Sequence, residues 1–258
     1  MSGQSKGWRS MIETAFTVPS DDRRLHATAI ENVAGRGDPY VLFLHGGGIS
    51  TTSEGVRYLR LALANAGVVS VAFDFFGLGK SGGILEDSSL QRRREETLSV
   101  VESLRPRRPR AIVATSMAGH TACRLLEDLN TEALVLFCPA AYDASAETAR
   151  FGSEFRRVIR STQDFSRSPA FAALSRYWGR LLVFYGTDDV VIPHEVQERY
   201  ISSAVNAQNV ESVLLTDVGH KLHVWLATHT SDRLAVCSRV IDALVCRVSN
   251  HRLRNGSV

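Results

Sequence analysis

The stretch AIVATSMAGH, residues 111–120, decides the fold of this chain. A run of apolar residues leads through Thr115 into Ser116, and the residues that follow the serine are mostly small. Short apolar runs fit strands that are buried on both faces of a parallel sheet, and serine is a common first residue of a helix. The stretch therefore predicts a strand that turns sharply into a helix at Ser116.

Two interpretations of Ser116 are open at this point. A nucleophilic serine at such a turn has a strained backbone, which costs about 1–3 kcal/mol, and the crowded turn needs small residues nearby. Ala114, Ala118 and Gly119 meet that need, although the usual signature is G-x-S-x-G. In the other interpretation Ser116 only caps the helix.

Apolar runs and helical stretches alternate along the rest of the chain. Residues 14–19 and 25–30 flank a polar turn and predict an antiparallel hairpin. The runs that predict parallel strands are residues 40–45, 68–75, 111–115, 133–138, 181–186 and 212–217. The helical stretches are residues 56–67, 90–104, 118–129, 194–204 and 232–248. This alternation predicts an α/β fold, with helices on both faces of a mostly parallel sheet and right-handed crossovers.

The interval 142–178 has no obvious strand. It is too long for a plain loop, so we expect a lid insertion over the edge of the sheet. Its aromatic residues could line an apolar pocket, or they could form a small core under the lid.

Polar residues follow several of the predicted strands. In an open parallel sheet, ligands bind beyond the carboxyl ends of the strands. HGGG follows the first parallel strand, Ser116 the third, GTDDVVIP the fifth and DVGH the sixth. We therefore expect the serine, an aspartate and a histidine to meet at one edge of the sheet.

Five stretches in this order resemble the α/β-hydrolase superfamily: LHGGG, DFFGLGKSGG, FCPAA, YGTDDVVIP and VGH. The order serine, aspartate, histidine along the chain is also that of the superfamily. The resemblance runs from about residue 16 to residue 248 and is greatest to small bacterial cinnamoyl and feruloyl esterases and to monoacylglycerol-lipase-like enzymes of the serine aminopeptidase type. It implies a single α/β-hydrolase domain over residues 1–258, with a lid insertion at about 142–178.

The resemblance implies a catalytic triad. Ser116 is the expected nucleophile, and His220 is the expected base, because a neutral imidazole can take the serine proton. The pattern G-x-x-D selects Asp189 rather than Asp188 as the acid that orients the imidazole. His223 is a rival base, but it falls within what looks like a helix.

The glycines of HGGG let backbone N–H groups approach a ligand closely. By the resemblance, Gly47 and Met117 donate backbone N–H groups to the oxyanion, and His45 braces the glycine loop. We expect no cofactor and no metal, because the cysteines lack metal-ligand spacing and the glycine stretches lack the spacing of phosphate-binding loops.

A triad with an oxyanion hole transfers an acyl group to water through an acyl-serine. We expect the substrate to be a carboxylic ester with a hydrophobic or aromatic acyl group. A thioester of coenzyme A or of a carrier protein is the first alternative, because the 142–178 interval holds six arginines, with Arg180 just beyond it, against four acidic residues. Peptide hydrolysis is a further alternative, and a non-catalytic ligand-binding homologue is the alternative of another class.

Composition limits the remaining possibilities. The 258 residues are 44% hydrophobic and 22% charged, with a net charge of +3, which is typical of a globular protein and indicates no nucleic-acid partner. The arginines at 92–94 and 105–110 predict a solvated surface. No long apolar run is present, so we expect no secretion signal, no membrane span and a cytoplasmic location. Four cysteines in apolar contexts predict buried free thiols: Cys123, Cys138, Cys237 and Cys246.

Overall fold

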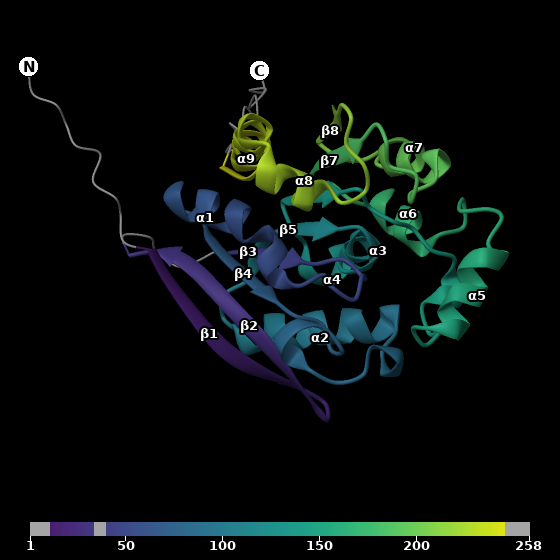
Figure 1. The fold of residues 1–258 in the computed structure, drawn as a ribbon, viewed down its shortest axis with the longest axis horizontal. Coiled ribbons are helices and arrows are strands. Elements are labelled where there is room, and N and C mark those ends of the chain that lie inside the picture. The colour runs from purple at the N-terminus through teal and green to yellow at the C-terminus, as the bar shows by residue number, and fades with distance from the viewer. Residues whose placement is uncertain (1–10, 34–39, 246–258) are drawn as a thin grey trace, which may run out of the picture.

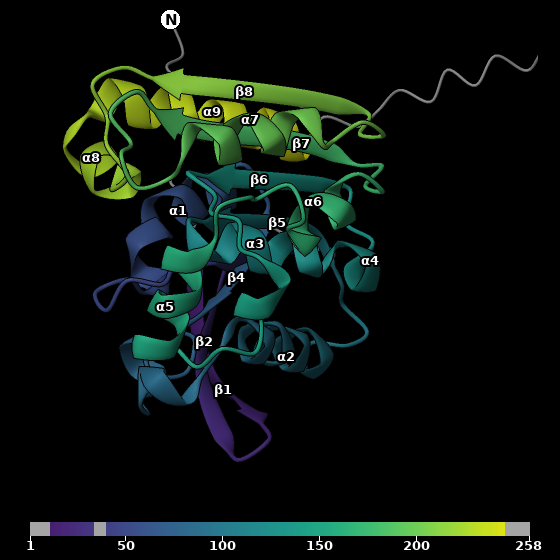
Figure 2. The same cartoon turned by 90° about the vertical axis from the view of Figure 1, so that its right-hand side faces the viewer.

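One eight-stranded sheet forms the centre of the computed structural model, which describes residues 11–33 and 40–245 (Figures 1 and 2). The strand order is β1-β2-β4-β3-β5-β6-β7-β8. The strands are β1 (Met11–Ser20), β2 (Arg23–Asn32), β3 (Tyr40–Leu44), β4 (Val69–Phe73), β5 (Pro109–Thr115), β6 (Ala133–Phe137), β7 (Arg180–Gly186) and β8 (Asn209–Leu215). β3 to β8 run parallel, whereas β2 is antiparallel to both β1 and β4. The predicted hairpin and the six predicted parallel strands are confirmed.

Helices cover both faces of the sheet, as predicted (Figure 1). On one face α1 (Arg57–Asn65) contacts β4 and α9, and α9 (Thr230–Val245) contacts β6, β7 and α8 (Leu222–Thr228). The other face carries α2 (Leu90–Ser103), α3 (Met117–Arg124), α4 (Leu126–Leu129), α6 (Pro169–Leu174) and α7 (His194–Ser202). The helix predicted at 118–129 is divided into α3 and α4, and residues 246–248 of the last predicted helix lie outside the described residues.

The core is built on the central strands, in which every residue of β3, β4 and β6 is buried. Strands covered by helices on both faces have no solvent side, and this explains their unbroken apolar runs. Phe137 of β6 stacks on Phe184 of β7 with ring centroids 4.7 Å apart. This packing holds the carboxyl ends of β6 and β7 against each other.

The interval 142–178 holds no strand and contains η4 (Ala144–Ala146), α5 (Ser153–Ser161) and α6. Figure 2 shows α5 outside the main layers, in front of the sheet. The buried aromatic side chains of this interval are Phe151, Phe155, Phe171 and Tyr177, whereas Trp178 is 68% exposed. Most of the aromatics therefore form a core in and under the insertion, the second of the two interpretations.

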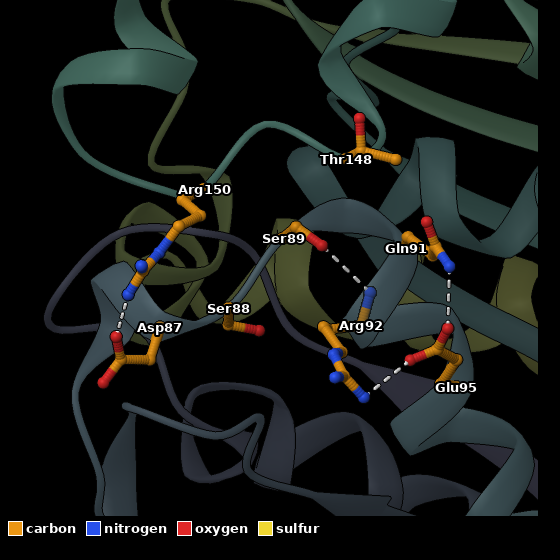
Figure 3. Close-up of a pocket in the computed structure, with 8 residues that line it drawn as sticks. All are labelled: Asp87, Ser88, Ser89, Gln91, Arg92, Glu95, Thr148 and Arg150. Carbon is orange, nitrogen blue, oxygen red and sulfur yellow. Dashed lines mark hydrogen bonds and ion pairs between the residues drawn. The ribbon is translucent and has the colours of Figure 1, made fainter.

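Polar contacts fasten the insertion to the start of α2 (Figure 3). Arg150 forms an ion pair with Asp87, which lies shortly before α2, and the Gln91 N–H of α2 donates to the Glu147 carbonyl over 2.9 Å. The Phe151 N–H donates to the Ser88 carbonyl over 2.9 Å. These contacts place Phe151 and α5 at a defined position over α2.

The remaining expectations on single residues are mostly confirmed. Cys123, Cys138 and Cys237 are buried free thiols, and Cys246 lies outside the described residues. In the described ranges 11–33 and 40–245, no helix combines the length and the apolar character that crossing a bilayer requires.

Arg93 is an exception to the prediction that the arginines at 92–94 lie on a solvated surface. Its neighbour Arg92 is exposed and forms ion pairs, but Arg93 itself is fully buried. Its guanidinium donates to the Gly46 carbonyl over 3.2 Å and lies over the rings of Phe75 and Phe151, at 4.5 and 5.0 Å. The interpretation of Arg93 as a surface residue is therefore wrong, because α2 turns this position inward.

We predict that Arg93→Ala destabilises the protein far more than Arg92→Ala. Truncation of a large buried side chain typically costs about 2–5 kcal/mol, whereas exposed ion pairs contribute about 0–1 kcal/mol. Urea unfolding of both variants measures the difference. Equal losses of unfolding free energy would contradict a structural role for the buried Arg93 side chain.

Candidate active site

Ser116 occupies a sharp turn between β5 and α3. Its φ is +52° and its ψ is −121°, a backbone conformation that is strained for a residue other than glycine. The Ser116 N–H donates to the Phe137 carbonyl over 2.9 Å, and its carbonyl accepts from the Ala140 N–H over 3.0 Å. The side chain makes no capping hydrogen bond to α3, so the turn presents the hydroxyl rather than using it as a cap.

The small residues around Ser116 are needed because the turn is packed against the end of β6. A Cβ atom on Gly119 would lie 2.5 Å from the Cβ of Pro139, so only glycine fits there. Ala114 and Ala118 are completely buried, and alanine fits at both positions. The structure thus explains why the departure from G-x-S-x-G is tolerated.

The structure brings Ser116, His220 and Asp189 together from three strand ends. The Oγ atom of Ser116 lies 2.9 Å from Nε2 of His220, and Nδ1 of His220 lies 2.9 Å from Oδ2 of Asp189. These residues follow β5, β8 and β7. The arrangement can pass the serine proton to the imidazole while the carboxylate holds the other ring nitrogen.

Asp189 is held as a carboxylate. Burial alone would raise its pKa, but hydrogen bonds from His220 and from the backbone N–H groups of Val191 and Ile192 outweigh that effect and keep the pKa below its usual value. Asp188 is exposed, and its side chain accepts a hydrogen bond from Thr187 instead. Of the two adjacent aspartates, only Asp189 contacts His220.

The other candidate histidine is engaged elsewhere. His223 lies in α8, where its ring contacts the Thr115 hydroxyl at 2.8 Å and the Tyr58 hydroxyl at 3.0 Å. Burial lowers the pKa of His223 to about 4, so the ring is neutral. His223 therefore braces the residue in front of Ser116 and does not contact the serine.

His45 braces the glycine loop. Its Nδ1 lies 2.9 Å from the Gly46 carbonyl, and its Nε2 accepts a hydrogen bond from the Phe75 N–H over 3.0 Å. Because Nε2 accepts, Nδ1 carries the proton and donates to Gly46. Burial, together with the nearby charge of Arg93, lowers the pKa of His45 to about 4 and keeps this neutral tautomer.

Gly47 and Met117 lie against each other beside Ser116. A Cβ atom on Gly47 would lie 2.6 Å from the Sδ and Cε atoms of Met117, so a side chain at position 47 would displace the methionine. Met117 is the first residue of α3, and its N–H is among those that have no acceptor within the helix. Met117 directly follows Ser116, and a Cβ atom on Gly46, the neighbour of Gly47, would lie 3.4 Å from the Cβ of Ser116.

Arg93 is the residue of this region that the sequence interpretation missed. Its position on α2 follows the helical spacing of the buried residues Leu90, Thr97 and Val100. That spacing is the signal by which it could have been found. Through Gly46 it supports the same loop that His45 braces.

Comparisons with known proteins agree with this architecture. A sequence profile described as the alpha/beta hydrolase family matches residues 41–180. No curated protein sequence matches the chain at a significant level. Among solved structures, the esterase Pf2001 of Pyrococcus furiosus is similar, with 20% identity and a TM-score of 0.67 over 91% of this chain and 92% of that one.

Two further structures share the fold at low identity. The Est1E protein of Butyrivibrio proteoclasticus, solved with ferulic acid bound, is 18% identical, with a TM-score of 0.63 over 86% of this chain and 98% of that one. A thioesterase domain from the curacin biosynthetic pathway is 16% identical, with a TM-score of 0.65 over 89% and 99% of the two chains. The family profile spans more than half of the chain, and the chain is thus an enzyme of the hydrolase type that belongs to the alpha/beta hydrolase family.

Proposed function

We propose that this hydrolase cleaves carboxylic esters through an acyl-serine intermediate. The observation that carries the proposal is the unbroken series of contacts from Ser116 through His220 to Asp189, with 2.9 Å at each step. Nucleophile, base and orienting acid at these distances are the requirements of serine acyl transfer.

In the first half of the reaction, Nε2 of His220 takes the proton as Oγ of Ser116 attacks the acyl carbon. Asp189 accepts from Nδ1 throughout and stabilises the imidazolium. Backbone N–H groups of Gly47 and Met117 stabilise the oxyanion, and each such donor typically contributes about 3–4 kcal/mol to the transition state. When the intermediate collapses, His220 returns the proton to the leaving alcohol.

Water then attacks the acyl-serine with the same groups in the same roles. His220 takes a proton from the water, and the second tetrahedral intermediate releases the acid and restores the Ser116 hydroxyl. The proton and the acyl group are both accounted for without a further reactant.

Exposed apolar side chains near the strand ends favour a hydrophobic ester. Ile49 follows the glycine loop, and Val190 and Val191 follow Asp189; all three are exposed. Since β3 and β7 run parallel, their carboxyl ends lie at the same edge of the sheet. The esterase and the ferulate-bound protein among the structural neighbours are consistent with such a substrate.

We predict that Ser116→Ala retains the fold and loses about 10³–10⁶-fold in turnover on a p-nitrophenyl ester. A fluorophosphonate probe should label the wild-type protein once per chain and should leave the variant unlabelled. Ser166→Ala, which changes an exposed serine of the insertion, is the control and should be labelled like the wild type. Stoichiometric labelling of Ser116→Ala would contradict the assignment of the nucleophile.

We predict that Asp189→Asn lowers turnover by roughly 10⁴-fold, because the asparagine amide favours the wrong imidazole tautomer. Asp188→Asn, one residue away and exposed, should change turnover less than about threefold. Steady-state kinetics of the two variants decide between the aspartates. Reversed losses would show that Asp188 is the functional acid.

One feature of α5 favours a thioester as a second candidate substrate class. Three arginines and two serines lie on one face of α5 at the spacing i, i+3, i+4, i+7 and i+8, and they line an open hollow of about 500 Å³: Ser153, Arg156, Arg157, Arg160 and Ser161. In the described part of the chain, no carboxylate forms an ion pair with these arginines. Arginine binds phosphate oxygens through paired N–H groups.

The opposite face of α5 packs toward the candidate site. Phe155 packs into a small apolar cluster with Phe151, and Met117 packs against the same cluster. An α-helix with its side chains is about 10–12 Å across. A phosphate held by the arginines would therefore lie at least about one helix diameter from Met117, a separation that only a substrate with a long phosphate-bearing arm could span.

We predict that Arg156→Glu/Arg157→Glu raises KM for an acyl-CoA thioester about tenfold and leaves kcat and KM for a short neutral ester unchanged. The loss should shrink at high salt, because exposed charges are screened beyond about 8–10 Å. Arg105→Glu/Arg108→Glu makes the same change in net charge near the amino end of β5 and is the matched control. Equal losses on both substrates, or no loss on either, would argue against the thioester.

A further inference from the structure

Cys138 lies between the candidate nucleophile and the candidate acid. It follows β6, the strand between β5, which leads to Ser116, and β7, which leads to Asp189. The Cys138 N–H donates to the Phe184 carbonyl of β7 over 2.8 Å. Its side chain thus enters the site from a strand end that the triad leaves unused.

The Cys138 thiol lies close to both the carboxylate and the imidazole. The Sγ atom, a carboxylate oxygen of Asp189 and a ring nitrogen of His220 all lie within 4.8 Å of one another. Asp189 is held as a carboxylate, which can only accept hydrogen bonds. In a hydrogen bond between the two side chains, the thiol is therefore the donor.

The backbone of Cys138 carries a conformational cost. Its φ is +44°, in the left-handed region where glycine is favoured because it has no Cβ. The side chain is fully buried, so it cannot serve a contact with solvent. Strained non-glycine residues cluster at functional sites, and here the Sγ atom of the strained residue lies within 4.8 Å of a carboxylate oxygen of the candidate acid.

We propose that Cys138 is a positioning residue of this hydrolase: its thiol donates a hydrogen bond to the Asp189 carboxylate and fixes the group that orients His220. The inference rests on the proposed function, because Asp189 and His220 act on the substrate through Ser116. Val191 and Ile192 hold one carboxylate oxygen with their backbone N–H groups. The thiol supplements these bonds from the β6 side.

Burial and the charge of Asp189 raise the pKa of the Cys138 thiol, which stays protonated and keeps its proton for donation. The titratable groups that face the thiol are Asp189, His220 and, from β7, Tyr185. Burial raises the pKa of Tyr185, and its hydroxyl donates to the Gln197 carbonyl. Tyr185 is neutral, so the charge that the thiol meets is that of Asp189.

Three variants distinguish the loss of the thiol's hydrogen-bond donor from a change in side-chain volume. Cys138→Ser keeps a donor, Cys138→Ala removes the donor, and Cys138→Gly removes the donor and relieves the left-handed backbone. We expect Cys138→Ser to stay within about twofold of the wild-type kcat on a neutral p-nitrophenyl ester. Cys138→Ala and Cys138→Gly should lose about three- to tenfold in kcat with little change in KM. Cys237→Ala, which removes a buried thiol on α9, is the control.

The pH profile distinguishes positioning from plain structural support. Without the thiol's donation, more of the Asp189 negative charge acts on His220 and favours the imidazolium. The acidic limb of kcat/KM should therefore move to higher pH in Cys138→Ala and Cys138→Gly and should stay in place in Cys138→Ser. A loss of activity without a shift in the acidic limb of kcat/KM would overturn the proposal. Equal losses of kcat in Cys138→Ser and Cys138→Ala would overturn it as well. Wild-type kinetics in Cys138→Ala would also overturn the proposal. If Cys138→Ala does not fold, Cys138→Gly provides the same test.

A readout without turnover separates this inference from the proposed function. The proton between His220 and Asp189 should give a downfield proton NMR signal that moves in Cys138→Ala and not in Cys138→Ser or Cys237→Ala. If the wild type shows this signal but no fluorophosphonate labels Ser116, the ester-hydrolase proposal fails. If labelling succeeds and the signal is the same in all Cys138 variants, the role of Cys138 is overturned alone.

Discussion

The left-handed turn at Ser116 is the constraint on which the rest of the site depends. It is held from the β6 side by two backbone hydrogen bonds, with Phe137 and Ala140. His223 contacts the hydroxyl of the preceding residue, Thr115, and its ring packs against Phe137. A strained residue persists only where its surroundings over-determine its conformation, and the strand order places β6 where it can do this. The need to hold this strained turn in place explains why His223, although close to Ser116 in space, serves as a brace.

The candidate site pairs the Asp189 carboxylate with the imidazole of His220. The pKa values of His45 and His223 are both lowered to about 4, so these rings stay neutral and act only through hydrogen bonds. Asp189 stays ionised because donors surround it, since a buried carboxylate without partners would become neutral. His220 is the histidine that contacts both Ser116 and Asp189, which is why it is the proposed base.

Most of the architecture could be predicted from the sequence, because its signals are local. Apolar runs mark strands covered on both faces, and the order of polar residues at strand ends brought Ser116, Asp189 and His220 to one edge. Arg93 was misjudged because its run of arginines is typical of an exposed helix face, although its spacing from the apolar residues of α2 places it on the buried face, where it packs against Phe75 and Phe151. The contact of Cys138 with Asp189 joins residues 51 positions apart, and no spacing in the sequence indicates it.

Met117 connects the chemistry to the insertion. Its backbone begins α3 beside Ser116, while its side chain lies against Gly47 and packs on the cluster that contains Phe155 of α5. A close-packed interior transmits small displacements, so a shift of α5 reaches Gly47 through the methionine side chain. Repacking of the insertion therefore acts on both proposed oxyanion donors at once. The proposed substrate binding by α5 and the proposed stabilisation of the oxyanion are for this reason coupled through one side chain.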